Sequence, residues 1–247
     1  WNTSINDVEI RANETIKRSY LYAEGKAGTF GNKNGRMYVN NSNISYLGWY
    51  DGDLVYTLNE GITISHVEDS AISNSVLINN VMNRMIYSNK TILYNNTINN
   101  SLLYSILFND DVDASSVTQR GSYGYKQIIN NTINMNSLRS GWSSSVIYLN
   151  EVNYTEIAGN NIINTGISSV LVEDRSSNVI LQDNKIIVAN LSNIEFAYYL
   201  STAFSNIIIK NDSVRHDSYR IMFVDKPQNI TIEGVNFTSK YVAGQIS

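Results

Sequence analysis

The chain has no cysteine, a single proline and few charged residues among its 247 positions. Without cysteine it can form neither disulfide bonds nor thiolate metal sites. Charged residues make up 16% of the sequence, against about a quarter in ordinary soluble domains, and the formal net charge is −4. Basic residues cluster at most in pairs such as Lys17-Arg18, so the concentrated cationic surface that nucleic acid requires is missing.

Long apolar runs are also absent, because none approaches the roughly 18 residues of a membrane-spanning helix. The sequence begins at Trp1 without Met and carries no signal peptide, so we expect a mature or excised piece of a longer protein. We expect no membrane span, no cofactor and no bound metal.

Uncharged polar residues are abundant instead, with 36 Asn and 30 Ser beside 17 Tyr. Thirteen Asn-x-Ser/Thr sequons occur, where chance placement of the 44 Ser and Thr residues would give about six. Glycosylated surface chains carry such sites in exposed turns, which predicts glycans at Asn89, Asn153 and Asn211. The alternative is that Asn-Asn-Thr is simply a good sequence for a turn followed by a strand.

One block recurs along the chain: a short apolar strand, a polar turn of four to six residues, and a second apolar strand. It occurs at residues 85–93, 169–181, 198–209 and 221–232. An Asn-rich corner follows it, as at Asn95-Asn96 and Asn130-Asn131. The mean spacing of the first turn is about 26 residues, a period typical of solenoids. We follow that turn through these positions: Asn41, Glu60, Asn89, Asp110, Glu151, Asp174, Ser201 and Asp225.

The repeat predicts an all-β parallel β-helix of about eight coils. Val, Ile, Thr and Tyr dominate the strands, and the Asn-Gly turns of antiparallel hairpins are nearly absent from the repeat. Asn suits the corners because it tolerates left-handed φ values. Each short strand would pair with its copies one coil away, and stacked Asn side chains would form ladders.

Residues 177–186 (SNVILQDNKI) and 228–237 (QNITIEGVNF) resemble the parallel β-helix repeat of pectate-lyase-like proteins. The resemblance covers roughly residues 35–240 and implies a right-handed coil with three sheets per turn. It leaves function open, because that family includes lyases, hydrolases, adhesins and viral tailspikes.

Residues 1–34 are less regular, and we expect a cap or linker there, with the β-helix over residues 35–247 and insertions near 109–124 and 139–145. Strand alternation predicts a set of side chains that point into the coil. They are Ile86, Leu93, Ile128, Leu171, Val179, Leu181, Ile207, Ile209, Ile230 and Ile232.

The best candidates for catalysis form an acidic row on successive turns. With neighbouring coils about 5 Å apart and second neighbours about 10 Å apart, the row matches carboxylate spacings of glycosidases. It could equally hold a calcium ion, and acids are also ordinary turn residues. The row contains Asp110, Asp111, Glu151, Glu173 and Asp174.

Asn109-Asp110-Asp111 also resembles the paired-aspartate element of polygalacturonase-type hydrolases. Those enzymes carry His-Gly and Arg-x-Lys elements further on, whereas here His216 is followed by Asp217 and the Arg220 segment lacks the lysine. We therefore expect His216 to be a turn or surface residue rather than a base.

Aromatic side chains outside the repeat offer a binding site instead. Trp49 and Tyr50 lie in a glycine-flanked segment, and Trp142 lies in an insertion. Such rings could stack on sugars or anchor a protein partner, or they could simply pack over a coil.

The sequence favours a non-enzymatic extracellular module of a cell surface or virion, acting in structure, adhesion, or receptor or glycan binding. The alternatives are a polysaccharide-cleaving hydrolase or lyase using the acidic row, and a subunit of a filament, trimeric spike or other homo-oligomer. The composition resembles secreted proteins of thermoacidophilic archaea and their viruses, in which amide ladders would not titrate in acid.

Overall fold

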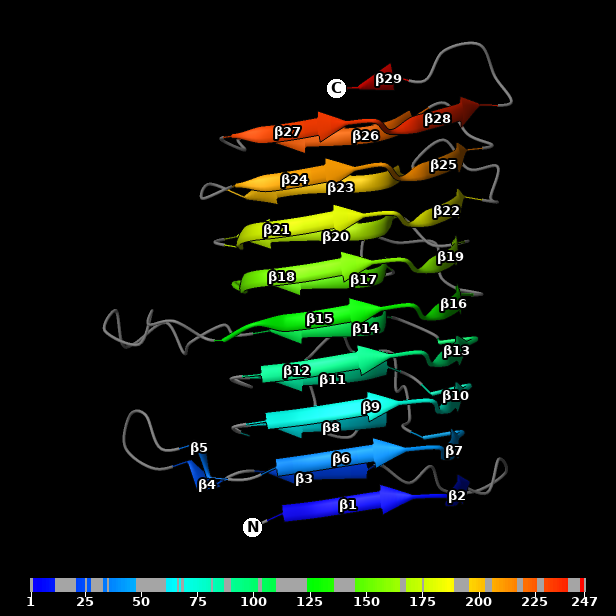
Figure 1. Ribbon diagram of the computed structural model, residues 1–247, viewed down its shortest axis with the longest axis vertical. Helices are drawn as coiled ribbons and strands as arrows, with labels where there is room; N and C mark the ends of the chain where they lie inside the picture. The colour runs from blue at the N-terminus through cyan, green and yellow to red at the C-terminus, as the bar shows by residue number, and fades with distance from the viewer. Residues whose placement is uncertain are drawn as a thin grey trace, which may run out of the picture.

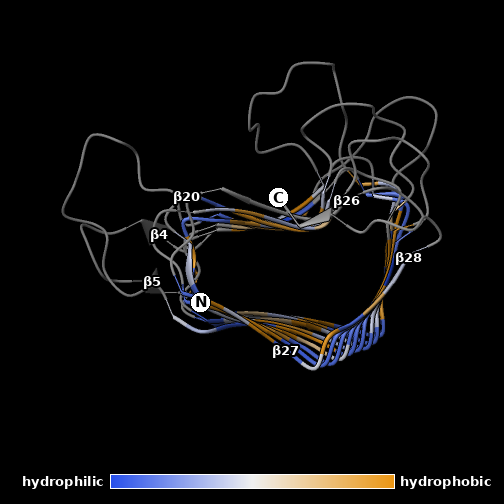
Figure 2. Cartoon of the chain, turned by 90° about the horizontal axis from the view of Figure 1, so that it is seen from above, coloured by the Kyte–Doolittle hydropathy of each residue, from blue (hydrophilic) through white to orange (hydrophobic). Residues whose placement is uncertain are grey.

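The chain winds into a right-handed parallel β-helix, with β1 and β29 at opposite ends (Figure 1). Seen along the axis, three sheets enclose one interior (Figure 2). This computed structural model describes residues 2–11, 21–24, 26–27, 33–34, 36–47, 61–65, 67, 69–80, 82–86, 90–101, 104–109, 124–135, 145–164, 168–174, 176–188, 196–202, 206–216, 220–225, 229–239 and 245–246.

Within these residues each sheet contains nine parallel strands, one per rung, and we number the rungs 1 to 9 from the N-terminus. Sheet A consists of β1 (Asn2–Asn6), β6 (Arg36–Asn40), β9 (Asp69–Ser73), β12 (Lys90–Tyr94), β15 (Lys126–Ile129), β18 (Asn153–Ala158), β21 (Ser177–Gln182), β24 (Ile207–Lys210) and β27 (Ile230–Glu233). Sheet B consists of β2 (Glu9–Arg11), β7 (Asn43–Ser45), β10 (Val76–Ile78), β13 (Thr97–Asn99), β16 (Thr132–Met135), β19 (Asn161–Asn164), β22 (Lys185–Val188), β25 (Ser213–His216) and β28 (Asn236–Ser239). Sheet C consists of β3 (Leu21–Glu24), β8 (Gly61–Ser65), β11 (Met82–Ile86), β14 (Tyr104–Asn109), β17 (Ser145–Asn150), β20 (Ser168–Asp174), β23 (Phe196–Thr202), β26 (Arg220–Asp225) and β29 (Gln245–Ile246). A separate antiparallel pair joins β4 (Lys26–Ala27) to β5 (Lys33–Asn34).

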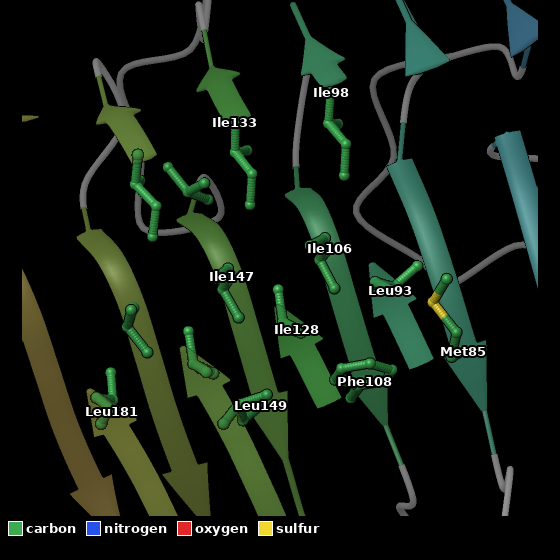
Figure 3. Close-up of a cluster of buried hydrophobic side chains, with 14 of the residues drawn as sticks. Met85, Leu93, Ile98, Ile106, Phe108, Ile128, Ile133, Ile147, Leu149 and Leu181 are labelled. Atoms are coloured by element: carbon green, nitrogen blue, oxygen red, sulfur yellow. The ribbon is translucent and has the colours of Figure 1, made fainter. Parts of the chain in front are cut away.

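Strand alternation places one set of side chains inside the coil, where identical positions of successive rungs stack. In sheet A, for example, Leu93 pairs with Ile128, and Ile128 with Ile157. The three sheets together bury one continuous apolar cluster, part of which Figure 3 shows. Because every rung contributes the same inward positions, the core has no centre and grows by repetition.

The corner between sheets A and B is built from residues in the left-handed conformation. Asn74, Asn95, Asn130 and Asn211 have φ between 49° and 55° there, a region that Asn enters more readily than most residues. At rung 6 the corner residue is Gly159 (φ 64°), and a Cβ on it would collide with Oδ1 of Asn130. The prediction that Asn turns the corners is confirmed.

The residue after each corner points inward and forms a buried hydrogen-bond ladder. Oδ1 of Asn131 accepts from the backbone N–H (2.9 Å) and Nδ2 (3.0 Å) of Asn96. Nδ2 of Asn131 in turn donates to Oδ1 of Asn160 (3.1 Å) and to the carbonyl of Leu93 (2.9 Å). The pattern repeats at the next rungs, so each amide satisfies itself and its neighbours. The ladder runs through Ser42, Ser75, Asn96, Asn131, Asn160, Asn184 and Asp212.

This geometry explains three sequons without glycosylation. Asn95, Asn130 and Asn211 are corner residues, each is followed by a ladder residue, and the Thr or Ser after that starts a strand of sheet B. A corner, a ladder residue and a β-branched or small strand residue produce the Asn-x-Ser/Thr pattern by themselves. The surplus of sequons is therefore weak evidence for glycans at those three positions.

The ladder changes character at Asp212, which is fully buried. Its Oδ1 accepts from the backbone N–H (2.7 Å) and Nδ2 (3.1 Å) of Asn184, and its Oδ2 accepts from the hydroxyl of Tyr198 at 2.6 Å. Burial raises the pKa of Asp212, against the opposing effect of these hydrogen bonds. Burial and the nearby carboxylate likewise raise the pKa of Tyr198 well above its ordinary value.

The segment expected to be a cap or linker, residues 1–34, contributes strands to the sheets, because β1, β2 and β3 pair in parallel with β6, β7 and β8. The described residues contain nine rungs, and the eight from residue 36 onward agree with the expected number of about eight coils. Asn41 belongs to the corner between sheets A and B, not to the turn in which we placed it. Of the insertions expected near 109–124 and 139–145, residues 110–123 and 139–144 lie outside the described residues.

The inward assignments hold for Leu93, Ile128, Val179, Leu181, Ile207 and Ile209, all fully buried. Leu171 is buried but on the other side of sheet C, packed with Tyr104, Leu107 and Tyr148. Ile230 is only partly buried and Ile232 is 42% exposed, because β27 is the last strand of sheet A and no further strand of that sheet lies beyond it in the described residues. The side chain of Ile86 lies outside the described residues.

Ile209 and Ile232 are neighbours in one inward column but differ in cover, which makes them a matched pair. Ile209→Ala should lower the free energy of unfolding by about 2–5 kcal/mol, because it opens a cavity in the core. Ile232→Ala should cost under about 1 kcal/mol, since much of that side chain already meets water. Urea unfolding followed by circular dichroism measures both, and equal losses would contradict the assigned end of the core.

From the ladder geometry we expect Asp212→Asn to preserve the fold and to make the free energy of unfolding less dependent on pH. A carboxyl whose pKa is raised on folding stabilises the protein below its unfolded pKa, and that contribution is lost as pH rises through the folded value. Asn keeps the Oδ1 acceptor for Asn184 without a buried charge, so the variant should equal or exceed the parent in stability at neutral pH.

Urea unfolding across pH 3–8 tests this, with Glu9→Gln as a control that removes an exposed carboxylate. A variant with the parent's pH slope would show that Asp212 does not carry the linkage.

Candidate functional site

The outer face of sheet A carries the largest gathering of exposed tyrosines in the described residues. Tyr94, Tyr125 and Tyr154 are each 43–52% exposed. Tyr125 and Tyr154 directly precede the paired residues Lys126 and Thr155, so they lie on neighbouring rungs at the same edge of the sheet. Rings at this degree of exposure present both an apolar surface and a polar tip to a ligand.

Glu156 lies on the strand of Tyr154, one rung from Tyr125 and two rungs from Tyr94. Three neutral donors hold its carboxylate. Its Oε2 accepts from the Tyr125 hydroxyl and from Nε2 of Gln127 at 3.0 Å, and its Oε1 accepts from Nε2 of Gln182 at 3.0 Å. The donors come from the rungs on either side, because Gln127 pairs with Glu156 and Gln182 lies one rung further on. We call Tyr94, Tyr125, Gln127, Tyr154, Glu156 and Gln182 the tyrosine face.

These hydrogen bonds fix the charge of the site. Donation from Tyr125, and then from Gln127, holds the pKa of Glu156 below its usual value. The same bond to Glu156, with some burial, raises the pKa of Tyr125. At neutral pH the face therefore presents one ionised carboxylate beside a neutral phenol, and the carboxylate can only accept hydrogen bonds.

One carboxylate limits the chemistry of this face. Glu156 is the only acid among the outward residues of β12, β15, β18 and β21. Glycoside hydrolysis normally needs two carboxyl groups, one of them protonated through a raised pKa. Among its neutral neighbours, Glu156 has no second carboxyl group with which to form such a pair on the described part of this face.

The predicted acidic row is only partly visible. Asp110 and Asp111 lie outside the described residues, and so does the side chain of Asp174. Glu151 lies in the turn between β17 of sheet C and β18 of sheet A, with φ 52°. Glu173 aligns with Asn150 on one side and Ser201 on the other, so no second acid stands level with it on either neighbouring rung.

Glu173 has a partner of a different kind. Its Oε2 accepts from the hydroxyl of Tyr148 at 2.7 Å, and the Tyr148 ring packs against Tyr104 with centroids 5.0 Å apart. Leu107 and Leu171 complete this cluster on the outer side of sheet C, and all four apolar residues are buried. Glu173 thus belongs to a packed cluster rather than to an open acidic groove.

Some of the remaining predicted site residues lie within the described part of the chain and others do not. Trp49, Tyr50, Trp142 and Asn89 lie outside the described residues. Asn211 is an exposed corner residue. Asn153 starts β18 and is half-buried, and its Oδ1 accepts from Ser177 (2.9 Å) and Asn178 (2.6 Å).

Sequence reasoning missed the tyrosine face, although a signal existed. Once the corner pairs are fixed, counting back along each strand of sheet A assigns Gln127, Glu156 and Gln182 to the outside. The search for acids at turns passed over Glu156 because it lies inside a strand. The expectation for His216 was also wrong, since it is fully buried on the inner side of β25.

The described residues contain no group of three or more His, Asp or Glu side chains that could hold a metal ion. No helix in that part of the chain is long and apolar enough to cross a membrane.

No protein-family model and no curated protein matches the chain. Several solved structures share its fold, among them an epimerase and an adhesin. A double mutant of the periplasmic alginate epimerase AlgG aligns with a TM-score of 0.53 at 11% identity, over 99% of this chain and 69% of the epimerase. PfbA, a surface adhesin of Streptococcus pneumoniae, aligns with a TM-score of 0.58 at 13% identity, over 99% of this chain and 62% of the adhesin.

These identities establish the fold and nothing finer. Neither structure supports the archaeal origin suggested by the composition. The all-β parallel β-helix predicted from the repeat is confirmed, and so are the three sheets implied by the resemblance to pectate-lyase-like repeats.

Proposed function

We propose that this protein is a non-enzymatic extracellular module that binds a glycan through the tyrosine face. The observation that carries the proposal is the arrangement around Glu156: two glutamines and the Tyr125 phenol hold one carboxylate in place, exposed Tyr154 lies on the same strand, and exposed Tyr94 lies two rungs away on the same face. Rings that stack on sugar and fixed polar groups that meet hydroxyls are what a carbohydrate site needs.

The rigidity of the solenoid supports this assignment. The tyrosine face lies on hydrogen-bonded strands of four successive rungs rather than on a loop, so its groups keep their spacing without a ligand. Preorganised groups lose less entropy on binding. A flat face with neighbouring rungs about 4.8 Å apart suits an extended polymer better than a small ligand.

An adhesive role at a cell surface or on a virion fits the same features. One structure of similar fold is a surface adhesin and another is a periplasmic epimerase that acts on alginate, so both roles occur on this architecture. We place this chain with the binding proteins because the described outer face of sheet A offers one carboxylate where glycoside hydrolysis normally needs two.

Binding should depend on the exposed rings. Tyr154→Ala should weaken binding of the cognate glycan by roughly three- to tenfold, the value of one aromatic contact. Ile208→Ala is the matched control, since Ile208 is exposed on the same outer face two rungs from Glu156. Calorimetric titration with soluble polysaccharides measures the affinities.

The same polysaccharides should be left intact, as measured by release of reducing ends and of unsaturated products. If the parent cleaves a polysaccharide and Asp174→Asn or Glu156→Gln does not, the protein is a polysaccharide-cleaving enzyme and this proposal is wrong.

An extracellular module with this many sequons should carry glycans when taken from its natural source. We expect occupancy at Asn89, Asn153 and Asn211, with Asn211 the most accessible of the two described sites. Peptide mass spectrometry on native material checks each site. If all three are bare, the sequons reflect only the preference of Asn for turns and of Thr and Ser for the strands that follow, and the extracellular placement loses its main support.

A further inference from the structure

The tyrosine face carries a fixed negative charge, and no basic side chain of the described residues binds it. The three side chains that hydrogen-bond to Glu156 are neutral, and they come from Tyr125, Gln127 and Gln182. Lys90 is the only basic residue among the outward strand positions of rungs 4 to 7 in sheet A, and it lies two rungs from Glu156 at the edge of the sheet. The centre of the face is therefore anionic.

The hydrogen-bonding capacity of Glu156 is largely used but not exhausted. A carboxylate offers about four acceptor positions, and three of them are taken by protein donors. What remains is an acceptor oriented by its neighbours and able to receive a hydroxyl from a ligand. It can offer nothing to a ligand carboxylate, which has no proton to donate and bears the same charge.

We propose that the tyrosine face selects an uncharged, hydroxyl-bearing glycan and rejects polyuronates, and that Glu156 determines this specificity. The inference rests on the proposed function, because it assigns the class of glycan that the same face binds. Stacking on the tyrosines is indifferent to charge, so the discrimination comes from the carboxylate: it accepts a hydroxyl from one class and repels the other.

The experiment compares the parent with Glu156→Gln and Glu233→Gln. In Glu156→Gln the new amide has nearly the same shape as the carboxylate and could still accept at Oε1, while its Nε2 could donate to the Tyr125 hydroxyl. Glu233→Gln removes an equal charge from the outer face of sheet A at rung 9, away from the tyrosines. Binding is measured with a panel of uncharged glucan and xylan oligosaccharides and with alginate oligosaccharides of matched length.

We expect the parent to bind an uncharged oligosaccharide and to bind alginate at least tenfold more weakly. Glu156→Gln should lose roughly tenfold in affinity for the uncharged ligand, because the ligand hydroxyl then donates to a neutral acceptor in place of a charged one. It should also gain at least tenfold for alginate at about 0.01 M salt. That gain should shrink at 1 M salt, where charges are screened within about 3 Å. Glu233→Gln should change neither affinity by more than about twofold.

The outcomes separate the two claims. If the parent prefers alginate, or if Glu156→Gln and Glu233→Gln behave alike, Glu156 does not set specificity, although the face still binds glycan. If neither class of oligosaccharide binds the parent, the proposed function itself is wrong. Thermal unfolding of each variant confirms that any loss of affinity occurs in a folded protein.

Discussion

The buried amide ladder at the corner between sheets A and B is the interaction on which the fold depends. At this corner each rung buries a backbone N–H group that receives no hydrogen bond from a neighbouring strand, and such a group needs another acceptor. Here the amide oxygen of the rung above accepts from that N–H, as Asn131 does for Asn96 and Asn160 does for Asn131. The same side chains donate back to carbonyls of the rungs below, so each link satisfies the corner and fixes the register of two rungs.

The fixed register brings residues that are far apart in the sequence together in one site. Tyr125 and Glu156 are 31 positions apart in the chain, and Gln182 is 26 positions beyond Glu156, yet the one-rung spacing brings them together. A slip of one residue would exchange the inner and outer faces of a strand and bury Glu156 where Ile157 now packs. The tyrosine face therefore depends on the corner ladder, although the two share no residue.

Two acids show how the same fold sets charge in opposite directions. Glu156 sits on the outer face, where donors from Tyr125 and Gln127 favour its ionised form and lower its pKa. Asp212 occupies a buried ladder position, where loss of water favours the protonated form and raises its pKa. Hydrogen bonds and desolvation act on both residues, and the degree of burial decides which effect is larger: Glu156 faces outward from a strand, whereas Asp212 points into the core from the corner.

The sequence by itself determined the architecture, because the period of about 26 residues, the Asn corners and the alternating apolar strands are local signals that repeat. It also identified the inward columns of sheet A, except at the end of the core, where Ile232 has no rung above it in the described residues. Only the tertiary structure decided which polar side chains meet. Glu156 resembles any surface acid in the sequence, and Glu173 resembles a member of an acidic row until stacking places it against Tyr148. The inward and outward positions of one rung follow from the residues of that rung. Contacts between rungs also depend on the length of every intervening loop, which the pattern of a single strand does not encode.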